Sequence, residues 1–320
     1  MTITEQLQEI VGARVTEQEP MGKHTNFRIG GPAKWFVEVR SIEEIKSVLE
    51  LAKREHVQTF VFGGGSNILV SDKGFDGIMI KMAMRTYEIQ GTRVRSDAGV
   101  LASALARATS MLGLKGLSWA ITLPGTIGGG VRGNAGCFGG EMKDYLVSVD
   151  VLRDGEVIEL KKEDLKFGYR ESAIKHSQDI VLSVVFELEE GDATELKMEI
   201  DDKLMKRKTS QPLGAGSAGC MFKNYEIQSD EELQRLKDKL DIPLEMQSQR
   251  HLSAGWLIDQ LDLKGMKIGG AQVSEVHGNF VLNVDSATAD DVGQLVALIK
   301  TRARNEYGIL LQEEIMYVGF

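Results

Sequence analysis

Two glycine-rich segments constrain this chain more than any other feature of its sequence. The first, Gly63–Asn67, reads Gly-Gly-Gly-Ser-Asn and lies between the apolar runs Val57–Phe62 and Ile68–Val70, so it predicts a loop that joins two short strands. The second segment runs from Pro124 to Gly136. Because glycine has no side chain, successive amide N–H groups in such loops can converge on an anion.

The pair of loops favours a dinucleotide cofactor held at its pyrophosphate, although each loop alone is also typical of a tight turn. Neither loop is one of the two common phosphate signatures. No Gly-x-Gly-x-x-Gly opens a helix with an acidic residue about 20 positions later, and no Gly-x-x-x-x-Gly-Lys-Ser/Thr occurs. The residues that we expect around the cofactor are Gly63, Gly64, Gly65, Ser66, Asn67, Pro124, Gly125, Thr126, Gly128, Asn134, Ala135 and Gly136.

The length and charge of the chain limit its class. At 320 residues it exceeds the usual size of a single core, so two or three domains are expected. The net charge of −9 argues against nucleic acid as a partner. No apolar run is long enough to span a membrane, and the first residues do not resemble a signal peptide. The two cysteines, Cys137 and Cys220, are too few for a disulfide framework or a thiolate zinc site, so we expect a cytoplasmic protein without a bound metal.

The spacing of apolar residues alternates between strand-like and helical patterns, which predicts an α+β fold. Ser41–Glu44 has the pattern of a capping box before an amphipathic helix, and another helix is expected to stop at Gly113. Asp154-Gly155 lies between two strand-like runs and predicts a hairpin. A charged helical stretch then runs to Lys208, and a domain boundary is expected near residues 190–210.

A basic cluster stands out from the acidic background of this chain, and it consists of Lys203, Lys206, Arg207 and Lys208. Cations suit the C-terminal turn of a helix, so a solvated helix end explains most of them. Lys208 is the best candidate for a ligand contact, because a third glycine-rich segment, Gly214–Asn224, follows it closely. Cys220 lies in that segment. A lone cysteine is most often a small buried apolar residue, but the glycines here favour a site that a ligand can reach.

With these segments identified, the chain resembles the UDP-N-acetylenolpyruvoylglucosamine reductase family over almost its whole length. The matching segments are Thr25–Gly31, Gly63–Asn67, Pro124–Gly140, Gly168–Ser172, Arg207–Asn224, Ala254–Ile258 and Ile268–Ser274. The resemblance implies a two-part FAD-binding domain of the vanillyl-alcohol oxidase type and a C-terminal α+β substrate-binding domain. The first FAD-binding subdomain is implied to comprise residues 1–82 together with the strand 312–320. The second FAD-binding subdomain comprises residues 83–208, and the substrate domain comprises residues 209–311.

The resemblance also implies the reaction. Members of the family use non-covalently bound FAD, with NADPH as the hydride donor, to reduce UDP-N-acetylglucosamine enolpyruvate to UDP-N-acetylmuramate for peptidoglycan. The carbon next to the substrate carboxylate must be protonated, so the site needs an acid and groups that polarise the carboxylate. By motif match, Arg170 and Glu314 polarise the carboxylate, and Cys220 occupies the position of the proton donor. Residues implied near the nucleotide sugar are Lys208, Asn224, Lys264 and His277, of which His277 is almost as well explained by a structural role.

This chain departs from the family pattern at two places. The proton donor is usually a serine, whereas this chain has Cys220. A thiol, with a reference pKa of about 8.5, is a better proton donor than an alcohol, provided that nearby cations do not convert it to a thiolate. Between Arg170 and Lys208 there is no tyrosine, so the chain resembles the subgroup that lacks a tyrosine lid. Two alternatives stay open: another flavoprotein of this fold with flavin tethered at Cys137, and a non-catalytic nucleotide-sugar-binding relative.

Overall fold

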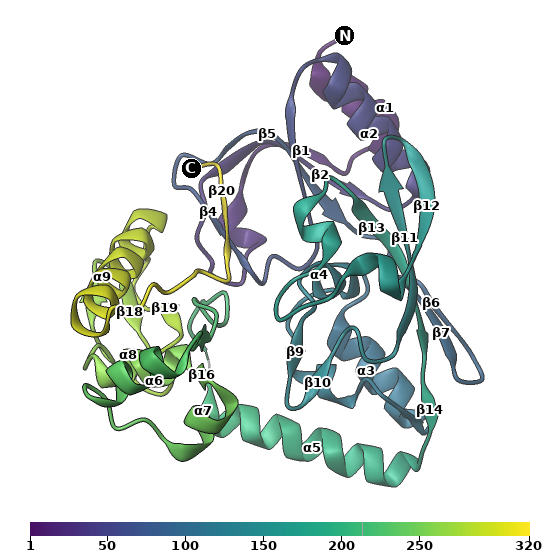
Figure 1. The fold of residues 1–320 in the computed structure, drawn as a ribbon. Helices are drawn as coiled ribbons and strands as arrows, with labels where there is room; N and C mark the ends of the chain where they lie inside the picture. The colour runs from purple at the N-terminus through teal and green to yellow at the C-terminus, as the bar shows by residue number, and fades with distance from the viewer. Residues whose placement is uncertain (213) are drawn as a thin grey trace. The chain divides into compact units, whose positions relative to one another are not determined.

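The computed structural model describes residues 1–212 and 214–320, which fold into two compact units (Figure 1). The first unit comprises Met1–Glu19, Pro32–Gly65 and Phe75–Thr209. The second comprises Pro20–Gly31, Ser66–Gly74 and Ser210–Phe320. Each unit therefore contains segments that are far apart in the sequence. In the described ranges, no helix combines the length and the hydropathy that crossing a membrane requires.

The first unit begins with a four-stranded sheet whose order is β1-β2-β5-β3. Its strands are β1 (Val15–Pro20), β2 (Pro32–Val39), β5 (Phe75–Met82) and β3 (Gln58–Phe62). The last three run parallel, and α2 (Ile42–Arg54) connects β2 to β3. Figure 1 shows α2 beside α1 (Ile3–Val11). Both helices bury an apolar stripe, which the amphipathic pattern after Ser41 predicts for α2.

A second sheet of the first unit is antiparallel, in the order β12-β11-β13-β7-β6. Its strands are β6 (Tyr87–Gln90), β7 (Arg93–Asp97), β11 (Leu146–Arg153), β12 (Glu156–Lys161) and β13 (Ile180–Glu187). The predicted hairpin is present, because Asp154 and Gly155 join β11 to β12 with φ values of 50° and 82°. Two positive φ values are what a two-residue hairpin turn requires, which explains the Asp-Gly pair.

The other helices, short strands and 3₁₀ turns complete the first unit. They are α3 (Ala102–Met111), β8 (Leu114–Lys115), α4 (Ile127–Arg132), β9 (Gly136–Cys137), β10 (Gly140–Glu141), β14 (Glu189–Glu190), α5 (Ala193–Ser210), and the 3₁₀ turns η2 (Ser118–Thr122), η3 (Lys162–Leu165) and η4 (Ala173–His176). The helix expected to stop at Gly113 is α3. The charged helical stretch is α5, and Lys203 is the one basic-cluster member that is buried there.

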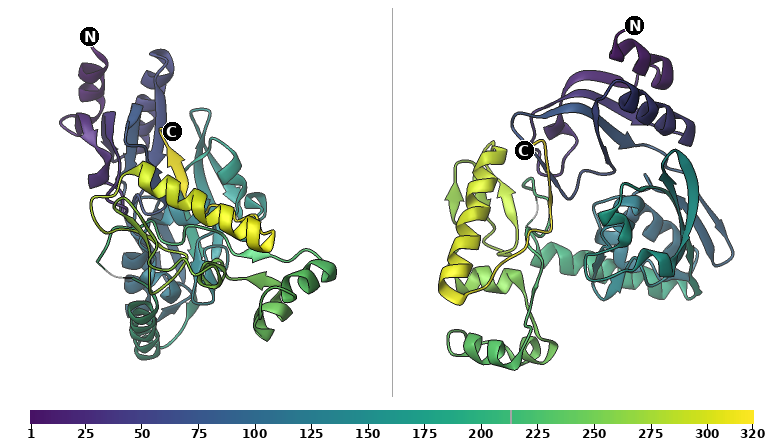
Figure 2. Two further views of the ribbon diagram at one scale, coloured as in Figure 1. Left: turned by 90° about the vertical axis from the view of Figure 1, so that its left-hand side faces the viewer. Right: turned by 45° about the horizontal axis from the view of Figure 1, so that its top comes forward.

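The second unit has its own apolar core around α9 (Ala289–Tyr307). This helix lies along the sheet of β17 (Lys267–Ile268), β18 (Ala271–Val273) and β19 (Val281–Asn283) (Figure 2). Thr288 forms a reciprocal capping box at its start and Gly308 adopts the left-handed conformation at its end. The remaining elements are η1 (Met21–Lys23), β15 (Tyr225–Glu226), α6 (Asp230–Lys237), α7 (Leu244–Gln249), β16 (His251–Leu252) and α8 (Ala254–Gln260).

One further ladder of the second unit joins distant segments. Strand β20 (Met316–Val318) runs parallel to β4 (Ile68–Val70), which directly follows the first glycine loop. The amide of Met316 also donates to the carbonyl of Asn67 at 3.0 Å. The end of the loop is thereby held by the last strand of the chain.

The capping box expected at Ser41 is only half formed. The hydroxyl of Ser41 accepts from the amide of Glu44, as predicted. The carboxylate of Glu44 accepts instead from the amide of Arg40, at 2.6 Å, and from the guanidinium of Arg14. The prediction was wrong in this half because Arg14, a distant residue, draws the carboxylate away from the N-cap amide. The same pairing lowers the pKa of Glu44, mainly through the hydrogen bond from Arg14.

Candidate functional site

The first unit brings the two predicted glycine loops into contact. A Cβ atom added to Gly63 would lie 2.1 Å from Oγ1 of Thr126, so no larger residue fits there without movement. A Cβ atom on Gly64 would lie 3.4 Å from the carbonyl oxygen of Pro124, which is ordinary contact. Close approach of the two loops therefore explains the glycine at position 63 in particular.

The contact between the loops leaves backbone donors available. Within the described part of the chain, the amides of Gly64, Gly65, Gly125 and Thr126 donate no hydrogen bond. Unsatisfied backbone donors that are close together form a concave anion site. A pyrophosphate fits this donor set, because it offers several acceptor oxygens and negative charge. These residues therefore fit the FAD that the sequence predicts at the two loops.

Asn134, expected near the cofactor, is fully engaged within the protein. It is completely buried. Its Nδ2 donates to Oε2 of Glu141 at 2.9 Å and to the carbonyl of Gly168 at 2.8 Å. Its Oδ1 accepts from the amide of Lys143 at 3.2 Å. The side chain of Asn134 thus ties the second glycine loop to the segment that carries Arg170.

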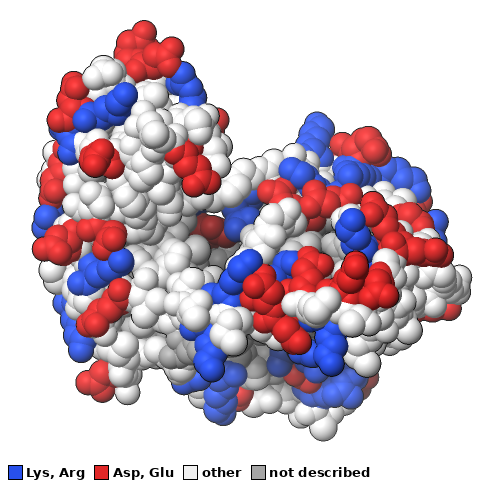
Figure 3. All heavy atoms as spheres, turned by 90° about the horizontal axis from the view of Figure 1, so that it is seen from below, with Lys and Arg blue, Asp and Glu red and all other residues white. Residues whose placement is uncertain are grey.

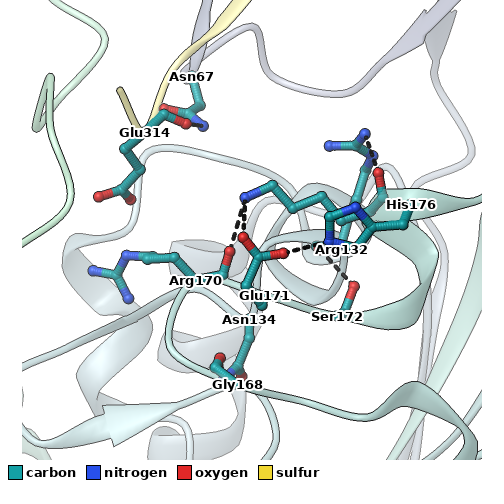
Figure 4. Close-up of polar contacts among 10 residues, drawn as sticks. Asn67, Arg132, Asn134, Gly168, Arg170, Glu171, Ser172, His176 and Glu314 are labelled. Carbon is teal, nitrogen blue, oxygen red and sulfur yellow. Dashed lines mark hydrogen bonds and ion pairs between the residues drawn. The ribbon is translucent and has the colours of Figure 1, made fainter. Parts of the chain in front are cut away.

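Arg170 lies in a two-residue turn (Figure 4). Gly168 and Glu171 exchange backbone hydrogen bonds of 3.0 and 3.2 Å around it. Arg170 itself has φ 55°, which costs a residue with a side chain about 1–3 kcal/mol. Its guanidinium donates to the carbonyl of Gly136, the last residue of the second loop, at 2.8 Å, and lies 5.3 Å from the ring centre of Tyr169. Two hydrogen bonds therefore join the turn to the second glycine loop: Asn134 donates to the carbonyl of Gly168, and Arg170 donates to the carbonyl of Gly136.

Charged groups surround this turn in Figure 4. Lys175 donates to the carbonyl of Arg170 at 2.9 Å and to Glu171 at 3.2 Å. The other carboxylate oxygen of Glu171 is bonded to the His176 ring at 2.8 Å. Arg132 is partly buried beside them, and burial lowers the pKa of its guanidinium. The hydroxyl of Ser172 donates to the Arg132 carbonyl at 2.6 Å.

Cys137, the residue that a covalent flavin link would need, is held as a thiol. Burial, the largest effect, raises the pKa of Cys137. Its sulfur lies 3.5 Å from Oγ1 of Thr122 and donates to the carbonyl of Trp119. A raised pKa disfavours the thiolate that a covalent link would require, so this geometry does not favour tethered flavin.

The second unit brings Cys220 and Glu314 onto neighbouring extended segments. The amide of Glu314 donates to the carbonyl of Met221 at 2.8 Å. The amide of Lys223 donates to the carbonyl of Gln312 at 2.9 Å. The side chain of Asn67 donates to the carbonyl of Glu314 at 3.1 Å. Two predicted catalytic residues and one residue of the first loop therefore share one local framework. Arg170 belongs to the other unit.

Asn279, which the sequence analysis missed, holds this framework together. It is 3% exposed, and its side chain both accepts from the amide of Phe222, at 2.9 Å, and donates to the Phe222 carbonyl, at 2.8 Å. Its own carbonyl accepts from the amide of Met221. An asparagine immediately before the apolar run Phe280–Leu282 was the available signal.

The residues expected near the substrate differ in how they are held. His277 is half-buried, and burial lowers its pKa, so the ring is neutral near pH 7. Its Nδ1 accepts from the amide of Asn279 at 3.2 Å, and its ring packs edge-on against Phe280, the partner of Cys220 in an isolated antiparallel bridge. These contacts give His277 a structural role. Lys264 forms an ion pair of 2.8 Å with Asp259.

Asn224 and Lys208 complete the predicted set. The carbonyl oxygen of the Asn224 side chain accepts from the amide of Ala254 at 3.2 Å, at the start of α8. Lys208 is exposed in the last turn of α5, in the first unit. On the face seen in Figure 3, Lys and Arg side chains are interspersed with Asp and Glu side chains. This face therefore has no large patch of only positive or only negative charge.

Comparison with known proteins defines the class first. A family model described as an FAD binding domain matches residues 33–161, a range that contains both cofactor loops. The chain is therefore an FAD-binding flavoprotein. A second model, described as the C-terminal domain of UDP-N-acetylenolpyruvoylglucosamine reductase, matches residues 211–318.

Individual relatives identify the family. The reductase of that name from Clostridioides difficile is 39% identical over 304 residues, covering 94% of this chain and 92% of the relative. That from Alkaliphilus metalliredigens is 40% identical, with the same coverage. The crystal structure of UDP-N-acetylenolpyruvylglucosamine reductase from Thermus caldophilus matches with a TM-score of 0.76 at 33% identity, over 95% of this chain and 99% of that one. The chain belongs to the UDP-N-acetylenolpyruvoylglucosamine reductase family, which confirms the predicted family, the α+β fold and the FAD cofactor.

Proposed function

We infer that this protein reduces UDP-N-acetylglucosamine enolpyruvate to UDP-N-acetylmuramate, using FAD with NADPH as the hydride donor, as a step of peptidoglycan precursor synthesis. The observation that carries this inference is family membership over 94% of the chain. The available amides of the two contacting glycine loops support it independently.

The cofactor and the protein divide the chemistry between them. Bound FAD, held by the amides of the two glycine loops, would supply the chemistry of hydride transfer from NADPH to the terminal carbon of the enol ether. The protein must stabilise negative charge that develops toward the substrate carboxylate and must protonate the neighbouring carbon. We assign the first task to Arg170 and Glu314, by motif match: Arg170 through its positive charge, and Glu314 in its neutral carboxyl form, which can donate a hydrogen bond. The guanidinium of Arg170 is held at Gly136, at the end of the cofactor loop, which supports its place at the reacting centre.

We assign the proton to Cys220. A thiol with a reference pKa of about 8.5 gives up its proton far more readily than an alcohol. Glu314 and Cys220 lie on adjacent hydrogen-bonded segments of the second unit, a geometry suited to a carboxyl group and a thiol that act on neighbouring substrate atoms. Cys220 is partly exposed, so a substrate can reach it.

The remaining assignments concern substrate binding and organisation. We propose that Asn224, Lys264, Lys208 and His277 lie near the nucleotide sugar. For His277 we propose an indirect contribution, because its Nδ1 is already bonded to Asn279. The division into 1–82 with 312–320, 83–208, and 209–311 is proposed as the functional arrangement. We also propose a cytoplasmic location, where NADPH and nucleotide sugars are made.

Absorption spectroscopy and an enzyme assay together test the function. We expect purified protein to show flavin absorption and to oxidise NADPH only when UDP-N-acetylglucosamine enolpyruvate is added. Acid precipitation should release the flavin into the supernatant, because Cys137 is held as a thiol. Colour that remains with the precipitate would favour the tethered-flavin alternative. A colourless protein without NADPH oxidation would favour the binding-protein alternative.

A further inference from the structure

Lys175, which follows the turn that carries Arg170, is hydrogen-bonded to that turn. Lys175 Nζ donates to the backbone carbonyl of Arg170 at 2.9 Å and to Oε1 of Glu171 at 3.2 Å. The second oxygen of Glu171 is bonded to the ring of His176. Lys175 thus contacts both the backbone of Arg170 and the side chain of the next residue.

The backbone of Arg170 needs such support. Its φ of 55° is a conformation that a residue with a side chain keeps only when its surroundings fix it. Relaxation to an ordinary negative φ would rotate both the Cβ direction and the carbonyl to which Lys175 donates. The guanidinium would then leave the carbonyl of Gly136.

We propose that Lys175 is a positioning residue for the reductase reaction: by bonding the Arg170 carbonyl, it fixes the guanidinium at the end of the cofactor loop and acts on the reaction only through Arg170. The proposal rests on the proposed function of Arg170. A misplacement of about 1 Å in a reacting group can cost on the order of 10²-fold in rate, so a residue of this kind has a measurable effect.

The test begins with Lys175→Met, which keeps the length of the side chain and removes its donors. Lys162→Met is the matched control, because Lys162 also donates to a backbone carbonyl, that of Asp144, away from the turn. We expect Lys175→Met to slow substrate reduction by the reduced enzyme on the order of 10²-fold. Flavin content and flavin reduction by NADPH should stay at wild-type values. Lys175→Arg should restore most of the lost rate, because a guanidinium can donate to the same carbonyl.

A double-mutant cycle separates positioning from general damage. In an Arg170→Ala background, Lys175→Met should cause no further loss of rate. A second loss of similar size would overturn the proposal, since Lys175 would then act independently of Arg170. If Arg170→Ala itself leaves this half-reaction unchanged, the proposed function of Arg170 is wrong. If Arg170→Ala is slow and Lys175→Met is not, only the Lys175 proposal fails.

A measurement without cofactor gives a second readout. The amide of Glu171 donates to the carbonyl of Gly168 across the turn, so its hydrogen exchange, measured in FAD-free protein, reports on the turn itself. We expect its hydrogen exchange to accelerate in Lys175→Met and to stay unchanged in Lys162→Met. Unchanged exchange at Glu171 in Lys175→Met would show that the lysine does not hold the turn.

Discussion

The amide nitrogen of Glu314 lies 2.8 Å from the carbonyl oxygen of Met221, so the segment that carries Glu314 is hydrogen-bonded to the segment that carries Cys220. The side chain of Asn279 fixes the next residue, Phe222, through both its amide and its carbonyl. The relative placement of the carboxyl group and the thiol is therefore set by backbone bonds and one buried asparagine. Substitutions of either side chain should leave that framework in place.

Valine at position 64 should weaken FAD binding without unfolding the protein. The Cβ of Gly64→Val would meet the Pro124 carbonyl at an acceptable 3.4 Å, but its methyl groups would block access to the free amides of the loops. Gly293→Val is the matched control, because a Cβ there meets nothing within 4 Å. Flavin content after purification and titration of the FAD-free protein with FAD measure the effect. A Gly64→Val protein that folds and retains full flavin would show that this loop does not hold the cofactor.

Removal of the Arg170 guanidinium should affect one half-reaction selectively. One electrostatic donor to a developing oxyanion contributes about 2.7–4 kcal/mol, so Arg170→Ala should slow oxidation of the reduced enzyme by substrate about 10²–10³-fold. Flavin reduction by NADPH should change much less. Stopped-flow absorbance at the flavin wavelengths separates the two steps. Equal loss in both steps would contradict a role for Arg170 at the substrate carboxylate.

Substitution of Cys220 tests the proton donor. Cys220→Ser should keep substantial activity, because a hydroxyl can donate in the same place. Cys220→Ala should slow substrate reduction by roughly 10²–10⁴-fold, the usual size of general acid catalysis, and should still accept hydride from NADPH. A near wild-type rate in Cys220→Ala would make Cys220 a packing residue and assign the proton to another group.

The two cysteines should also differ in reactivity. Alkylating reagents should inactivate the protein through Cys220, and bound substrate should protect it, because attack requires an accessible thiolate. Cys137 serves as the internal control, since burial raises its pKa and its sulfur is bonded to Trp119 and Thr122. Mass spectrometry after brief alkylation identifies the modified residue. Inactivation that persists in Cys220→Ser would contradict the assignment.

His277 should make stability depend on pH. Burial lowers its folded-state pKa below the reference value of 6.5, so the unfolded chain binds more protons at acidic pH. The free energy of unfolding should therefore fall as pH drops below 6.5 and level off below the folded-state pKa. His277→Asn keeps an acceptor for the Asn279 amide and should flatten this dependence. Urea unfolding at several pH values gives the comparison, and parallel curves for wild type and His277→Asn would refute the prediction.

Local patterns in the sequence predicted the local structure well. The Asp154-Gly155 hairpin and the end of α3 follow from turn and capping chemistry within a few residues. The half-formed cap at Ser41 could not be predicted, because the competing partner, Arg14, is close only in the folded chain. Short-range rules fail where a distant side chain offers a stronger partner.

In the candidate site, too, features set by local sequence could be predicted, whereas contacts that the tertiary fold creates could not. Glycines of both loops were recognisable from sequence, because close approach leaves few alternatives at Gly63. The supporting contacts of Asn134, Lys175 and Asn279 were not, since each depends on which backbone carbonyl or amide the fold brings near. Asn134 illustrates this: its sequence position indicated the cofactor, and the fold also brings its side chain to Glu141, the carbonyl of Gly168 and the amide of Lys143.

The parallel pairing of β4 with β20 also sets an order of events during synthesis. Residues 68–70 leave the ribosome early, but their partner, Met316–Val318, is synthesised much later in the chain. Until then the edge of β4 is unpaired. This strand contains Leu69, which is completely buried in the folded protein. A nascent chain therefore carries an unpaired strand next to its cofactor loop until β20 has been synthesised. We expect it to need a chaperone or rapid completion during that interval, and to bind FAD productively only after β20 has docked.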